Sequence, residues 1–200
     1  MNFAEIKKCD IANGIGVRTS LFVSGCRHRC PECFNEVAWD FDAGSAFTEE
    51  VADEIKASLK IPYVDGLSVL GGEPLEPENQ EVLAPFLESV RAEVPGVDVW
   101  LWTGFVYEDL VAGTSRASTP ALERILDCVD VLVDGPFMRD LKDITLRFRG
   151  SSNQRIIDLG RTREEGRVCL WSDGPVLATR AWKEDEQEGR LTILPTGSRG

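Results

Sequence analysis

The chain has 200 residues, 42% of them hydrophobic and 28% charged, which is the composition of one ordinary globular domain with a short appendage. Its formal net charge of −12, from 34 acidic and 22 basic residues, argues against extended binding to nucleic-acid phosphate. No apolar run approaches the roughly 20 residues of a membrane span, and residues 1–8 lack the apolar region of a secretory signal, so we expect a cytoplasmic protein with no membrane partner.

Predicted strands and helices alternate from residue 18 onward. The strand formers of residues 18–23 lead directly into a loop rich in cysteine. Thr48 can cap a helix that ends at Pro62, because apolar residues recur at helical spacing between them. The elements that follow are a strand at 67–70, a helix at 78–93, a strand at 97–102, a helix at 122–129 and a strand at 131–133, with irregular stretches expected at 36–47 and 105–120.

This order of elements predicts a parallel α/β sheet built from right-handed crossovers. Such sheets bind ligands at the carboxyl ends of their strands. Four loops follow a predicted strand directly: the cysteine loop 25–35, Gly71-Gly72-Glu73, Thr103-Gly104 and Asp134-Gly135. Since these loops would share one edge of the sheet, the cysteines are expected to face a common cleft.

The character of the chain changes beyond about residue 158. Charged residues of alternating sign dominate there, and only residues 168–171 and 191–194 resemble short strands, which could pair as a terminal hairpin. We therefore expect a core domain at residues 1–158 and a C-terminal extension at residues 159–200.

The cysteine loop contains Cys26, Cys30 and Cys33 in the spacing Cys-x3-Cys-x2-Cys. Thiolates so close together are typical ligands of zinc or of iron–sulfur clusters, and the lack of an obvious fourth cysteine favours a centre with an open position. His28 would have to bind from a cramped position to close a zinc site, so we interpret it as a solvated loop residue. The other cysteines, Cys9, Cys128 and Cys169, are interpreted as structural.

Further short motifs accompany the cysteine loop in order along the chain. They are Asp10–Arg18, Leu21–Cys26, Cys33–Asn35, Gly71–Leu75, Trp100–Gly104, Val131–Gly135 and Arg149–Gln154. The cysteine loop resembles that of the radical SAM superfamily. The ordered set over about residues 1–158 is, more narrowly, similar to the family of proteins that activate anaerobic ribonucleoside-triphosphate reductases.

The resemblance implies a partial, open TIM-like (β/α) barrel with parallel strands. It also implies one 4Fe–4S cluster held by Cys26, Cys30 and Cys33, with the fourth iron left for S-adenosylmethionine. The positions that would contact this cofactor are Glu32, Cys33, Phe34, Gly71, Gly72 and Glu73. By their place at the same sheet edge, Thr103 and Asp134 join them as hypothetical contacts to the ribose or the carboxylate. The loop 149–154 could face the cofactor or a partner protein.

The implied activity is that of a radical SAM oxidoreductase. An electron from a flavodoxin- or ferredoxin-like donor would cleave S-adenosylmethionine reductively, and the 5′-deoxyadenosyl radical would generate a glycyl radical on the large subunit of the reductase. One alternative is a different radical SAM enzyme, such as the activase of another glycyl-radical enzyme. The other is a zinc-binding interaction module without enzymatic activity.

Three arginines lie near the cysteines in this otherwise acidic chain. Arg18, Arg27 and Arg29 could form a positive collar that steers an acidic electron donor toward the cluster. The competing interpretation is a set of solvated loop charges.

Overall fold

The computed structural model describes residues 1–172, of which Met1–Leu170 form one compact unit. The strands are β1 (Asn2–Asp10), β2 (Arg18–Val23), β3 (Ser45–Ala46), β4 (Gly66–Gly71), β5 (Asp98–Trp102), β6 (Val131–Asp134) and β7 (Arg155–Asp158). The α-helices are α1 (Glu49–Leu59), α2 (Pro77–Glu93), α3 (Tyr107–Val111), α4 (Pro120–Asp127) and α5 (Leu159–Glu165), and short 3-10 helices lie at Glu36–Trp39 and Arg139–Leu141.

The strands form a single mixed sheet in the order β3-β1-β2-β4-β5-β6-β7. The central four strands, β2, β4, β5 and β6, are parallel, as the alternation of elements predicts. Antiparallel strands are added at both sides, because β1 pairs with β2 and β7 pairs with β6. The expectation of a wholly parallel sheet is therefore wrong at its edges.

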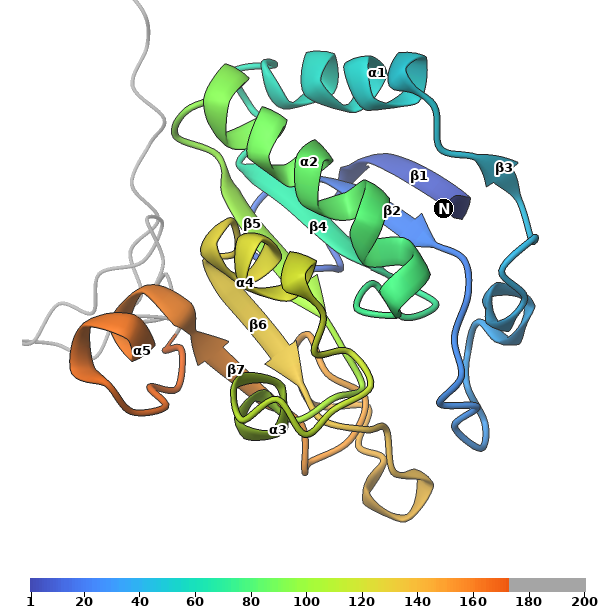
Figure 1. Ribbon diagram of the computed structural model, residues 1–200, viewed down its shortest axis with the longest axis vertical. Helices are drawn as coiled ribbons and strands as arrows, with labels where there is room; N and C mark the ends of the chain where they lie inside the picture. Colours follow the sequence, from blue (N-terminus) through green and yellow to red (C-terminus); the bar gives the residue numbers. More distant parts are fainter. Residues whose placement is uncertain (173–200) are drawn as a thin grey trace, which may run out of the picture. The chain divides into compact units, whose positions relative to one another are not determined.

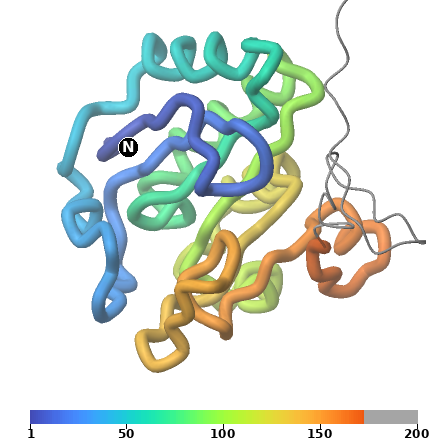
Figure 2. The backbone as a smooth tube through the Cα atoms, turned by 180° about the vertical axis from the view of Figure 1, so that it is seen from behind, coloured from blue at the N-terminus to red at the C-terminus, as the bar shows by residue number. Residues whose placement is uncertain are grey.

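The two faces of the sheet carry different side chains. Helices α1, α2 and α4 lie on one face (Figure 1), where alternate strand residues such as Leu21, Val69 and Leu101 form the hydrophobic core. By the two-residue period of a strand, Phe22 and Trp100 point to the opposite face. The view from behind shows that the loop between β6 and β7, in orange, extends along that side (Figure 2). The second face is the one left for a ligand.

Local signals explain the helices. Thr48 accepts a hydrogen bond from the backbone N–H of Val51 and so caps α1, as predicted. Thr119 caps α4 in the same way through the N–H of Ala121. The short helix α3 lies inside the stretch expected to be irregular. It spans only 5 residues, which are too few for a helical period to be recognised in the sequence.

Part of the expected C-terminal extension is described. Residues Leu159–Glu165 form α5, and Cys169 is buried. The expected strand at 168–171 reduces to a single bridge between Leu170 and Ile157. The second expected strand, at 191–194, lies outside the described residues. No helix among residues 1–172 combines the length and the apolarity needed to cross a membrane.

Candidate functional site

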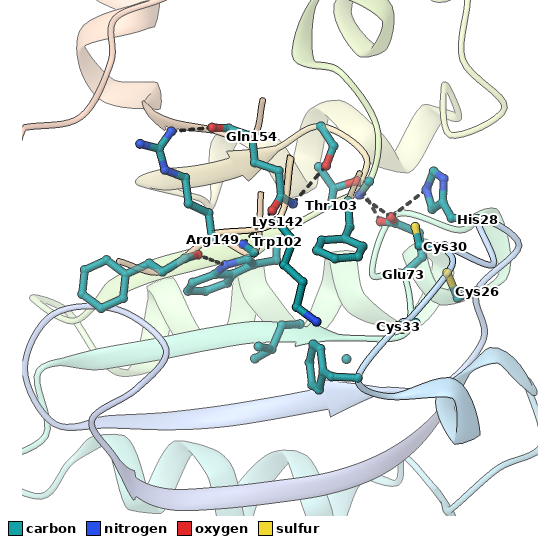
Figure 3. A pocket seen from close by; sticks show the side chains of 18 of the residues that line it. Cys26, His28, Cys30, Cys33, Glu73, Trp102, Thr103, Lys142, Arg149 and Gln154 are labelled. Atoms are coloured by element: carbon teal, nitrogen blue, oxygen red, sulfur yellow. Dashed lines mark hydrogen bonds and ion pairs between the residues drawn. The ribbon is translucent and has the colours of Figure 1, made fainter. Parts of the chain in front are cut away.

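A cavity of about 470 Å³ opens where the central strands end. Its lining includes a residue from each of the four strand-end loops, namely Cys26, Gly72, Thr103 and Gly135. The prediction that these loops meet at one cleft is therefore confirmed (Figure 3).

The first part of the cysteine loop is held by the fold. The backbone N–H of Gly25 donates to Ala38 O at 2.8 Å, and that of Cys26 donates to Trp39 O at 3.1 Å. Cys26 is only 9% exposed. Burial raises the pKa of its thiol to about 11, although the backbone N–H groups of His28 and Arg29 point at its sulfur and act in the opposite direction.

The second part of the loop is more open. Cys30 and Cys33 are half-buried, and the backbone N–H of Cys33 donates to Cys30 O at 3.1 Å. Arg29 and Glu32 have φ angles of 49° and 60°, in the left-handed region that side chains other than glycine rarely occupy. These conformations wrap the chain tightly between its three cysteines.

Backbone atoms pack so closely against Gly71 and Gly72 that neither position has room for a side chain: the end of β2 lies against Gly71, and Gly25 and Ala38 lie against Gly72. A Cβ atom on Gly72 would come within 2.7 Å of the carbonyl oxygens of Ala38 and Gly25, and one on Gly71 within 2.7 Å of Val23. Gly71 also has a φ of +114°. These glycines therefore bring the end of β4 against the start of the cysteine loop.

Glu73 is a buried hydrogen-bond acceptor, with 1% of its surface exposed. Its carboxyl group accepts bonds from Thr103 Oγ1 at 2.8 Å, from the N–H of Gly104 at 2.8 Å and from the N–H of Leu75 at 2.9 Å. Its own backbone N–H donates to Gly25 O. Glu73 thus ties together the loops that follow β2, β4 and β5. Thr103 lines the cavity, but its hydroxyl is directed at Glu73.

The interpretation of His28 as a solvated loop residue is wrong. Its side chain is largely buried in the cavity wall, with Nε2 at 3.0 Å from Glu73 Oε2 (Figure 3). The ring meets Phe105 edge to face, with centroids 4.6 Å apart. A side chain at Gly104 would collide with this ring. His28 therefore anchors the cysteine loop through its contacts with Glu73 and Phe105.

Two expected cofactor residues lie at the rim of the cavity. Glu32 is exposed and forms an ion pair with Lys142 at 3.4 Å. Phe34 is 83% exposed. Both line the opening, as does the exposed Ile144 from the loop between β6 and β7.

Several lining residues were not expected from the sequence. The aromatic side chains among them are Trp39, Phe137 and Phe148. The cavity also extends to Ala12 and Asn13 in the loop between β1 and β2. Among the lining residues that were not expected to contact the cofactor, only Trp102 could have been found from the sequence. It lies two residues after Trp100 in a predicted strand, so both side chains are on the same face.

The loop at residues 149–154 forms one wall of the cavity. Arg149 and Gln154 line it (Figure 3). Arg149 donates to the backbone oxygen of Gln154 at 2.6 Å, and the side-chain oxygen of Gln154 accepts from the N–H of Gly150. The loop is therefore braced by its own polar side chains.

Asp134 does not point into the cavity lining. Its carboxyl group is buried, accepts a bond from the N–H of Tyr107 at 2.8 Å and pairs with Arg155 at 2.5 Å. The hypothesis of a contact with ribose is thus replaced by a structural role, and Gly135 lines the cavity instead.

The structure contradicts the collar of three arginines. Arg18 is fully buried and pairs with Asp98 at 2.6 Å. Arg27 pairs with Glu76 and Glu78. Both charges are therefore balanced locally, which leaves Arg29 as the remaining member of the proposed collar.

Comparison with known proteins identifies the family. A model described as a 4Fe-4S single cluster domain matches residues 12–157. The anaerobic ribonucleoside-triphosphate reductase-activating protein of Escherichia coli K12 is 42% identical over 156 residues, which cover 77% of this chain and 96% of that protein. The protein of the same name from enterobacteria phage T4 is 39% identical over 156 residues, covering 78% of this chain and 93% of that protein. The chain belongs to this family of activating proteins.

The cysteine loop fits the iron–sulfur group of the reductase-activating family. Cys26, Cys30 and Cys33 are free thiols that line one cavity, and amide groups directed at a sulfur stabilise its thiolate form. Among residues 1–172, no three His, Cys, Asp or Glu side chains are grouped closely enough to chelate a single metal ion. A four-iron cluster is larger than one ion and takes its thiolates at separate iron atoms.

Proposed function

We propose that this member of the reductase-activating family cleaves S-adenosylmethionine reductively and thereby activates an anaerobic ribonucleoside-triphosphate reductase. When bound, the 4Fe–4S cluster and S-adenosylmethionine supply the one-electron chemistry that produces a carbon-centred radical, able to take a hydrogen atom from a glycine of the reductase. The observation that carries the proposal is the meeting of the cysteine loop, Gly72 and Thr103 in one cavity of a chain from this family.

In this proposal, the protein itself holds the cluster and S-adenosylmethionine and shields them from water. Cys26, Cys30 and Cys33 are proposed as the cluster ligands, and the cavity beside them has the volume of a small-molecule site. The backbone of Gly71, Gly72 and Glu73 would receive the methionine end of the cofactor. The Glu73 carboxyl group holds the surrounding loops, because its hydrogen bonds are already made within the protein.

The rim would receive the rest of the cofactor. Glu32, Cys33 and Phe34 are proposed to lie beside the adenine, and Thr103 is proposed to form part of the wall around the cofactor. The aromatic side chains of Trp39, Phe137 and Phe148 would help to keep water away from a reactive radical. We keep the partial, open barrel as the expected architecture, since an open side would admit a loop of another protein.

The large subunit of the reductase is the proposed partner, and a flavodoxin- or ferredoxin-like protein is the proposed electron donor. The relatives' name supports the first of these. An activase of another glycyl-radical enzyme would use the same cavity and remains the competing function. The zinc-binding module is disfavoured, because the matching family model describes a 4Fe-4S domain.

Electron paramagnetic resonance tests the proposal. The reconstituted protein is reduced under anaerobic conditions and mixed with S-adenosylmethionine and the reductase from the same host. We expect a glycyl-radical doublet that is lost in Cys26→Ala and kept in Cys9→Ala, because Cys9 is exposed and does not line the cavity.

The other outcomes separate the parts of the proposal. A reduced-cluster signal and 5′-deoxyadenosine without the doublet would keep the cofactor chemistry and remove this partner. A wild-type chain that binds zinc but assembles no cluster would overturn the proposal in favour of the interaction module.

A further inference from the structure

A buried carboxylate lies behind the cysteine loop, outside the cavity. Glu76 is 0% exposed and stands at the N-cap position of α2, where its side chain does not cap the helix. It accepts hydrogen bonds from two arginines instead: from Arg27 Nη1 at 2.8 Å and from Arg116 Nη2 at 2.8 Å. Figure 1 shows this end of α2 on the side where the chain leaves β2.

Glu76 also binds the backbone of the cysteine loop. The N–H of Arg27 donates to Glu76 Oε1 at 2.9 Å, which fixes the peptide group that joins Arg27 to Cys26. It is the last of four consecutive amides with a partner from elsewhere in the fold. The first three, at Ser24, Gly25 and Cys26, use backbone carbonyl groups, so only the fourth depends on a side chain.

Aromatic rings brace the two arginines. The guanidinium of Arg27 lies 4.4 Å from the centroid of Phe41, and that of Arg116 lies 4.5 Å from the centroid of Phe105. Phe105 in turn packs against His28 in the loop. Glu76 thus binds both arginines: Arg27, which is part of the cysteine loop, and Arg116, whose neighbour Phe105 packs against His28 of the same loop.

The charge of Glu76 suits this role. Burial alone would raise the pKa of its carboxyl group, but hydrogen bonds from Arg116 and Arg27 hold the pKa below its ordinary value. The carboxylate is therefore ionised at neutral pH, and hydrogen bonds to ionised groups are the stronger kind.

We propose that Glu76 is a positioning residue for the iron–sulfur cluster: it holds the Arg27 amide, and with it Cys26, in the conformation that receives the cluster. The inference rests on the proposed cluster ligation by Cys26, Cys30 and Cys33, and it does not depend on the cleavage of S-adenosylmethionine. It assigns a part in cluster binding to the N-terminal end of α2, although Glu76 does not itself line the cavity.

Two matched variants test the proposal. Glu76→Gln keeps the shape but removes the charge from the buried acceptor. Glu78→Gln is the control, because Glu78 also pairs with Arg27 but is exposed and bonds only its side chain. Far-ultraviolet circular dichroism checks that each variant is folded.

The first readout is hydrogen exchange in the cluster-free chain. We expect the Arg27 amide to exchange about tenfold faster in Glu76→Gln, because its acceptor becomes a neutral oxygen and a hydrogen bond to a neutral acceptor is weaker than one to a charged group, and at the wild-type rate in Glu78→Gln. The second readout is the loss of iron from the reconstituted protein to a chelator. It is expected to quicken, with a broadened signal of the reduced cluster in Glu76→Gln alone.

Wild-type exchange and wild-type iron loss in folded Glu76→Gln would overturn the proposal, and so would equal effects of the two variants. If Glu76→Gln does not fold, Glu76→Asp takes its place, because it keeps the charge on a shorter side chain. In that variant, unchanged exchange at Arg27 together with unchanged iron loss would contradict the proposal. A wild-type chain that binds no cluster but protects Arg27 would instead refute the proposed ligation.

Discussion

The two halves of the cysteine loop differ in what holds them. The backbone N–H groups of residues 24–27 donate hydrogen bonds to three other parts of the fold: β1, the segment at Ala38–Trp39, and Glu76. Residues 29–34 contain two left-handed residues, a local hydrogen bond between Cys33 and Cys30, and an exposed phenylalanine. The first half therefore belongs to the scaffold.

This difference shows how one short loop can serve both the fold and a cofactor. In the proposed ligation, Cys26 would be placed by the scaffold before any ligand arrives, whereas Cys30 and Cys33 would take their final positions when the cluster binds. A preformed first ligand lowers the entropic cost of ordering the others.

Removal of the Glu73 side chain should have the largest effect. In Glu73→Ala, the donors at Thr103, Gly104 and Leu75 lose their acceptor inside the protein, and we expect the free energy of unfolding to fall by about 3 kcal/mol or more. Urea denaturation measures this change. Glu81→Ala, at an exposed position of α2, is the control and should change the value by less than about 0.5 kcal/mol.

A methyl group at Gly72 should displace the first half of the loop. Because the new Cβ would lie 2.7 Å from the carbonyl oxygens of Gly25 and Ala38, Gly72→Ala should lower the free energy of unfolding by about 1–3 kcal/mol. Gly160→Ala, where a Cβ would meet only one atom at 3.4 Å, should not destabilise the chain. Equal thermal denaturation curves for the two variants would show that the loop does not rest on Gly72.

The reactivity of Cys26 should differ from that of an exposed thiol. Because burial raises its pKa to about 11, Cys26 in the cluster-free chain should be alkylated by iodoacetamide at least about tenfold more slowly than the exposed Cys9 at pH 8. The thiolate is the reactive form, so the rate at Cys26 should keep rising as the pH approaches 11. Peptide mapping by mass spectrometry gives both rates. Alkylation of Cys26 as fast as that of Cys9 would contradict its placement in the scaffold.

Truncation of Phe34 should leave the fold unchanged. Since Phe34 is 83% exposed, Phe34→Ala should alter the free energy of unfolding by less than about 0.5 kcal/mol. The same variant should weaken the binding of S-adenosylmethionine to the reconstituted protein, which calorimetry can measure. A large loss of stability would place the second half of the loop in the scaffold as well.

The predictable parts of the fold are those with a local signal. The helices α1 and α4 follow from caps and apolar stripes, α2 follows from its apolar stripe, and the parallel strands follow from buried apolar runs. Strand β1 escaped prediction because its exposed positions carry charged residues and it is only half-buried. The connection to β2, residues 11–17, contains Asn13-Gly14, a pair typical of hairpin turns, but it is longer than the two-residue loop that this pair marks.

The parts of the site that could be predicted are likewise those with a local signal in the sequence. The cysteine spacing and the strand-end loops predicted a common cavity, because both are properties of neighbouring residues. The partners of buried charges could not be predicted. Arg18 pairs with Asp98, and Glu76 pairs with Arg116, across separations that only the folded chain closes. For this reason the role suggested for Arg18 was wrong and that of Glu76 was not foreseen.

The most direct test of the contrast is amide hydrogen exchange, measured before and after reconstitution of the cluster. We predict that the amides of Gly25, Cys26 and Arg27 are protected in both states, because their acceptors are present in the protein alone. Apart from Cys33, whose N–H already donates to Cys30 O, the amides in residues 29–34 should gain protection only when the cluster is bound. Fast exchange at residues 25–27 in the cluster-free chain, equal to that at residues 29–34, would show that the loop is ordered by its ligand as a whole and would contradict the account.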